Sequence, residues 1–168
     1  MKTFTSASAA KHLKALQDEK DHILALEKAS CTYTLAAGEE AEPPEYDYEG
    51  TRREIARIDG QMRVLRHALH LFNATEVLPE SGVTVDEALI LLAQLNNEKA
   101  RLATMRSRQK RERAGHGLYY RSEAVEYTYA NYDVARAGED YLAISERISA
   151  LQLEIDLCNQ TRTFEADI

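Results

Sequence analysis

Apolar residues recur every three or four positions along four stretches of the chain, and this spacing limits the possible folds more than any other feature. It is the period of an amphipathic helix. We therefore expect helices at about residues 8–33, 47–72, 85–110 and 134–159. Helices of about 25 residues are ~37 Å long. The pattern predicts a mainly α, elongated, antiparallel four-helix or coiled-coil bundle that forms a single domain over residues 1–168.

The fourth stretch has the cleanest apolar seam, and the second has the alternation of three and four that is typical of a coiled coil. Three leucines of the fourth stretch, Leu142, Leu153 and Leu157, lie off its seam and widen the apolar face. Such a face is wider than one partner helix covers, so we expect it to contact a second helix or a second subunit. The two seams consist of Ile55, Ile58, Met62, Leu65, Leu69 and Phe72, and of Tyr141, Ile144, Ile148, Leu151, Ile155 and Cys158.

Polar signals mark where two of the helices begin. Asp47 is the expected N-cap of the second helix. Thr84 and Glu87 have the spacing of a capping box at the start of the third. Lys20 and Glu27 interrupt the stripe of the first helix, which we expect to be the least firmly packed.

Charge is distributed unevenly along the chain. Residues 36–49, the acidic segment, contain six carboxylates, no Lys or Arg, and the pair Pro43-Pro44. Residues 101–113 carry a net charge of +5, from six basic residues against Glu112. Both should lie at the same pole of an up-down bundle, where they could neutralise one another within a chain or between subunits. The basic patch that we single out is Arg106, Arg108, Lys110 and Arg111.

A tyrosine-rich insertion comes after the basic residues. Val125, Tyr127 and Tyr129 alternate with less apolar residues, which predicts a strand. We expect a short β-hairpin over residues 114–132 between the third and fourth helices, with its edge paired to another subunit. Interface or ligand candidates on it are His116, Tyr119, Tyr120, Arg121, Ser122, Glu123, Tyr127 and Tyr129.

Catalytic and metal signatures are weak. Glu19 and His22 form a single Glu-x-x-His pair, whereas a dinuclear carboxylate site in a bundle needs two such pairs. His67 and His70 are best explained as surface histidines. We find no nucleophile elbow and no phosphate-binding glycine loop, and predict no catalytic residues, metal or cofactor.

Targeting signals are also missing from the sequence. The N-terminus lacks the apolar core of a signal peptide. The longest apolar run, residues 88–93, is far shorter than the ~20 residues needed to cross a bilayer. We expect a cytoplasmic protein with no membrane association, in which Cys31 and Cys158 are reduced thiols.

The order of several short motifs resembles the septicolysin family of small bacterial helical proteins. These motifs are residues 38–44, residues 73–75, residues 82–89, the Tyr120-Arg121-Ser122-Glu123 turn and a final helix that closes at Asn159. The resemblance spans about residues 24–165. It implies an all-helical, self-associating cytoplasmic protein whose biochemical role is not established.

These observations favour a non-catalytic structural or interaction protein that forms a homo-oligomer through the fourth helix and the hairpin. One alternative is a ligand- or metal-binding enzyme whose site forms between subunits near the hairpin. A second is a nucleic-acid accessory protein that uses the basic patch beside the tyrosines. The net charge of −7 disfavours a general role in coating nucleic acid. Whether a small molecule binds is left open.

Overall fold

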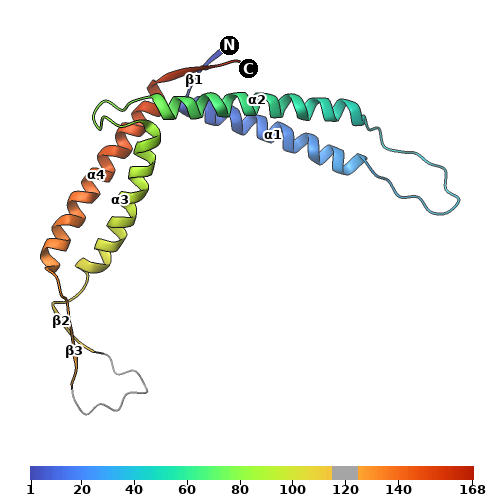
Figure 1. Cartoon of the computed structure of the whole chain (residues 1–168). Helices are drawn as coiled ribbons and strands as arrows, with labels where there is room; N and C mark the ends of the chain where they lie inside the picture. The colour runs from blue at the N-terminus through green and yellow to red at the C-terminus, as the bar shows by residue number, and fades with distance from the viewer. Residues whose placement is uncertain (115–124) are drawn as a thin grey trace. The chain divides into compact units, whose positions relative to one another are not determined.

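The computed structural model describes residues 1–114 and 125–168, and within them the chain is mainly helical (Figure 1). The chain divides into two units, residues 1–76 with 156–168, and residues 77–155. The elements are β1 (Lys2–Thr5), α1 (Ser6–Ser30), α2 (Tyr48–Thr75), α3 (Val85–Arg106), β2 (Arg111–Arg113), β3 (Tyr127–Tyr129), α4 (Val134–Thr161) and β4 (Thr163–Ala166).

In the first unit, α1 and α2 pack side by side as a helical hairpin whose connection is the acidic segment (Figure 1). The buried residues of α2 match the predicted seam: Ile58, Met62, Leu65 and Phe72. Leu16 of α1 joins Ile58 and Met62 in one apolar cluster. Toward the end of α1, Leu24 and Leu26 are exposed.

The two ends of the chain form an antiparallel ladder that the sequence did not predict. β1 pairs with β4, with Phe4 opposite Phe164. The ring of Phe164 lies 6.3 Å from that of Phe4 and 5.1 Å from that of Phe72 on α2. Immediately after β1, Thr5 and Ser8 form a capping box, so α1 begins at Ser6, about two residues before the predicted start.

In the second unit, α3 and α4 lie side by side (Figure 1), and Tyr141 of α4 contacts two basic side chains of α3. The capping box at the start of α3 is confirmed: Thr84 N–H donates to Glu87 at 2.9 Å, and Glu87 N–H donates to Thr84 Oγ1 at 3.2 Å. Val85, Ala88, Leu95 and Leu102 of α3 are buried, and on α4 the buried Ile148, Leu151 and Ile155 match the predicted seam.

One expectation about the helices is not confirmed, and another is wrong. The four helices form two hairpins, each described in its own unit, and a four-helix bundle or coiled coil is not confirmed. The apolar pattern predicts a third helix that reaches residue 110, but α3 ends at Arg106. Ser107 is its C-cap, and the chain enters the ladder at Lys110, whose carbonyl accepts from Ala130 N–H just before the paired strand Arg111–Arg113.

A carboxylate of α4 holds the turn that precedes α3. The turn closes through Gly82 N–H, which donates to the Leu78 carbonyl, and Gly82 has the positive φ of +70° that favours glycine. Glu154 Oε1 accepts from Glu80 N–H at 2.6 Å and from Ser81 N–H at 3.1 Å. Burial alone would raise the pKa of Glu154, but the hydrogen bonds from Glu80 and Ser81 together outweigh it, and the net pKa is lowered.

Phe4→Ala should lower the free energy of unfolding by about 3 kcal/mol, because a nearly buried phenyl ring is lost from the cluster that joins β1, β4 and α2. Urea unfolding followed by circular dichroism measures the change. Thr3→Ala, on the exposed side of the same strand, is the control and should be close to neutral. Equal effects of the two substitutions would contradict this packing.

Glu154→Ala should lower the free energy of unfolding at neutral pH by about 1 kcal/mol, a value that allows for solvent screening of a partly exposed carboxylate. Because the pKa of Glu154 is lowered in the folded state, its contribution is complete above its ordinary pKa and disappears as the pH falls through the folded value. The difference from the wild type should therefore vanish in acid. Glu146→Ala, which removes an exposed carboxylate of the same helix, is the control and should be close to neutral at neutral pH.

Candidate functional site

The strongest candidate site is one side of the two-stranded ladder of β2 and β3. Arg111 lies opposite Tyr129, and Arg113 lies opposite Tyr127. Directly opposite residues, and residues two apart on one strand, point to the same side of a ladder. Arg111, Arg113, Tyr127 and Tyr129 therefore share one side, which we call the Arg/Tyr face.

Contacts within the Arg/Tyr face hold one of its cations in place. The guanidinium carbon of Arg111 lies 3.6 Å from the ring centroid of Tyr127 and 5.9 Å from that of Tyr129. A guanidinium stacked on an aromatic ring loses freedom but keeps its N–H edge available to an anion. Tyr127 and Tyr129 remain 41% and 63% exposed. The face is thus ordered and open to a partner.

The ladder is attached to the helices at its base. Ala130 N–H donates to the Lys110 carbonyl, and Ala114 N–H donates to the Glu126 carbonyl, so the hydrogen bonds extend one residue beyond each strand end. Tyr132 Oη donates at 2.7 Å to the Met105 carbonyl in the last turn of α3, which also accepts from Arg108 N–H at 3.3 Å. This anchoring sets where the Arg/Tyr face stands relative to α3.

The basic patch divides into two parts. Arg106 remains on α3, with its guanidinium carbon 3.9 Å from the ring centroid of Tyr141. Arg108, Lys110 and Arg111 lie beyond the helix end and are exposed. Within residues 1–114 and 125–168, neither these three side chains nor Arg113 forms an ion pair with a carboxylate. The end of this unit therefore carries four closely spaced cations without an anionic partner in the described part of the chain.

Several predicted site residues cannot be placed. His116, Tyr119, Tyr120, Arg121, Ser122 and Glu123 lie outside the described residues. The predicted strand is confirmed over Tyr127–Tyr129, and its partner is the basic strand β2. A hollow of about 270 Å³ lies beside the ladder, lined by residues that include Arg108, Glu112, Thr128 and Tyr132.

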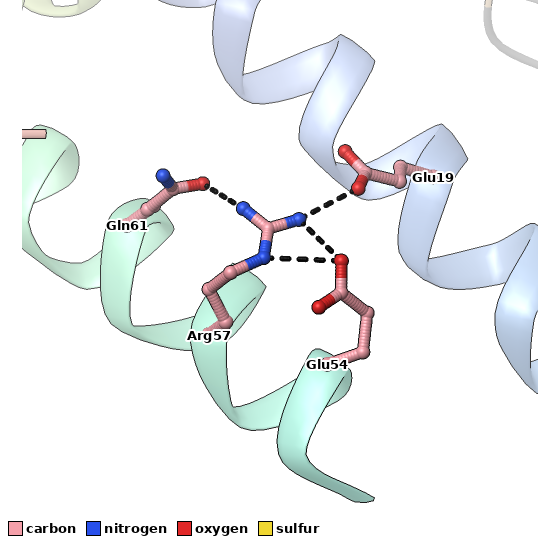
Figure 2. A network of polar contacts seen from close by, with 4 residues as sticks. All are labelled: Glu19, Glu54, Arg57 and Gln61. Carbon is pink, nitrogen blue, oxygen red and sulfur yellow. Dashed lines mark hydrogen bonds and ion pairs between the residues drawn. The ribbon is translucent and has the colours of Figure 1, made fainter. Parts of the chain in front are cut away.

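Glu19, the carboxylate of the single Glu-x-x-His pair of α1, forms a hydrogen bond with the neighbouring helix. Glu19 accepts a hydrogen bond from Arg57 of α2 at 2.8 Å, and Arg57 also contacts Glu54 and Gln61 (Figure 2). The hydrogen bond from Arg57 lowers the pKa of Glu54. Glu19 thus joins α1 to α2. Among the residues that the structure describes, no group of three His, Cys, Asp or Glu is placed to hold a metal ion.

Two polar residues that interrupt the apolar stripe of the first helix link it to other elements. Lys20 Nζ lies 2.7 Å from Asp59 on α2. Tyr46 Oη donates to Glu27 at 2.6 Å, and this hydrogen bond is the main reason that the pKa of Tyr46 is raised to about 12. The sequence carried no signal for either contact, because the partners are 39 and 19 residues apart.

Comparisons with known proteins support the fold. The chain is similar to a solved structure described as a functionally unknown conserved protein from Corynebacterium diphtheriae, with 16% sequence identity and a TM-score of 0.60. The similarity covers 98% of this chain and 100% of that one. No family model and no curated protein matches the chain. In the described part of the chain, no helix is sufficiently long and apolar to span a bilayer.

Tyr127→Leu should shift the side-chain proton resonances of Arg111 downfield, because the ring current of Tyr127 at 3.6 Å shields them in the wild type. Heteronuclear NMR of labelled protein measures the shift. Tyr129→Leu is the matched control and should have a smaller effect, because that ring is 5.9 Å away. Equal shifts in the two variants would contradict the stacking.

Proposed function

We propose that the protein is a cytoplasmic, non-catalytic structural or interaction protein that assembles with copies of itself through α4 and the β2–β3 ladder. The observation that carries this proposal is the exposure of Leu142 and Leu153, at 60% and 72%. They lie eleven residues apart on α4, about three helical turns, and so face the same side. Leu157, further along α4, is 61% exposed.

A second copy is a natural cover for this surface. Burying leucine side chains against one another removes apolar area from water, which is the main driving force for protein association. Two identical faces can cover each other around a twofold axis, the commonest symmetry of protein oligomers. The seam of α4 is already buried against its own chain, so the leucines off the seam are available to a partner.

The ladder supports the same proposal. A two-stranded ladder leaves unpaired backbone groups along its outer edges and is marginal in water by itself. Tyrosine and arginine, the residues of the Arg/Tyr face, are enriched in protein interfaces. The resemblance to the septicolysin family also implies self-association.

The double substitution Leu142→Lys/Leu153→Lys should convert the assembly to monomers at physiological salt, because it places two charges in the apolar contact. Sedimentation velocity at micromolar concentration measures the change. Since both leucines are exposed, the monomer should keep its helical circular dichroism spectrum.

The matched control, Ala143→Lys/Gln152→Lys, adds two positive charges at exposed positions next to Leu142 and Leu153 in the sequence. This variant should still assemble. A wild-type chain that sediments as a monomer at micromolar concentration would contradict the proposal.

A further inference from the structure

We propose that the Arg/Tyr face binds the acidic segment of a second copy of this chain. This inference rests on the proposed self-assembly and names the two surfaces of a charged contact within it. It is separate from the apolar contact through α4, because it pairs different residues and depends on salt.

The acidic segment presents carboxylates that have no partner in the described part of the chain. Glu40, Glu42, Glu45 and Glu49 are exposed, and within residues 1–114 and 125–168 none of them accepts a hydrogen bond or forms an ion pair. Asp47 is not one of these carboxylates, because it caps α2 by accepting from Gly50 N–H at 2.9 Å. Within the part of the chain that the structure describes, four carboxylates of the segment and four cations at the end of α3 and on β2 thus have no partner of opposite charge.

The segment is tied to the helices of the first unit at its C-terminal end, and a local hydrogen bond closes a turn near its start. At its start, Ala36 N–H donates to the Glu39 carboxylate at 3.0 Å. At its end, Tyr46 is bonded to Glu27 and Asp47 caps α2. Residues 40–46 between these anchors have neither helical nor strand structure. This fixed end reduces the conformational entropy that the segment would lose on binding.

The spacing of the charges agrees on the two surfaces. Arg111 and Arg113 are two residues apart on a strand, which separates their Cα atoms by about 6.6 Å. Glu40 and Glu42 are also two residues apart, and in an extended chain they point to the same side at a similar spacing. One guanidinium can therefore meet one carboxylate at each of two successive positions.

The aromatic part of the face suits the two prolines that come directly after Glu42. Pro43 and Pro44 restrict the backbone to an extended, polyproline-like conformation. Such segments bind to exposed aromatic rings at little entropic cost. Tyr127 and Tyr129 provide two such rings beside Arg111.

Each surface stands at the free end of its own unit. Glu40 and Glu42 of the acidic segment lie before α2, and the 28 residues of α2, about 42 Å in length, separate them from Glu76, where the chain leaves the first unit. The Arg/Tyr face is separated from Val77, where the second unit starts, by the 22 residues of α3, or about 33 Å. A contact between two different surfaces joins copies head to tail.

Charge reversal tests this contact. In the full chain at low salt, Arg111→Glu/Arg113→Glu and Glu40→Lys/Glu42→Lys should each weaken the salt-dependent part of self-association by about tenfold or more. Sedimentation equilibrium over a range of sodium chloride concentrations measures it. Arg63→Glu/Arg66→Glu, which makes the same charge change at exposed positions of α2, is the matched control and should leave association unchanged.

Mixing the two defective variants separates a contact between copies from any other effect of charge. The first variant keeps a native acidic segment and the second keeps a native Arg/Tyr face, so an equimolar mixture should recover association. Failure of the mixture to recover it would show that the two surfaces do not bind each other in different copies, and would overturn the proposal.

The remaining outcomes distinguish this inference from the proposed function. If the α4 leucine variant disassembles but Arg111→Glu/Arg113→Glu does not change the salt dependence, the proposed function stands and the charged contact is wrong. If the arginine variant loses retention of an oligothymidylate on a filter while its self-association is unchanged, the face binds nucleic acid instead, and the proposal is overturned.

Discussion

The ladder between β1 and β4 is the contact on which the first unit depends. It joins residues from the two ends of the chain, and closing so long a loop costs conformational entropy. The four paired positions of the ladder offset this cost, together with the contacts among the tilted rings of Phe4, Phe164 and Phe72. Since α1 begins directly after β1, at the capping residue Thr5, the ladder also determines where α1 lies against α2.

Much of the helical structure could be predicted from the sequence, because a helix that buries one side repeats its apolar residues with the period of its own turns. The ladder at the chain ends could not be predicted this way. Each strand has only four residues, and β1 buries only Phe4, so no alternation is long enough to recognise. The linking roles of Lys20 and Glu27 were also missed, since their partners are remote in sequence.

The candidate site was predicted only in part, because a local pattern can indicate a strand but not the strand with which it pairs. Alternation indicated a strand at Tyr127 and Tyr129, and the structure has one there. The sequence Arg111-Glu112-Arg113 suits a polar helix end as well as a strand, and only pairing with β3 decides between them. That register also determines which cation stacks on which tyrosine, and local propensity does not specify it.

The antiparallel direction of β1 and β4 has a mechanical consequence. Lys2 is paired with Ala166, and the amino group of Met1 lies 3.4 Å from the Asp167 carboxylate, so the two ends of the chain leave the ladder on the same side. A force that pulls these ends apart would break the hydrogen-bonded pairs one after another, starting from the pair nearest the ends, and not all at once. The first unit should therefore give way to tension applied at the termini at a much lower force than to tension applied across its helices.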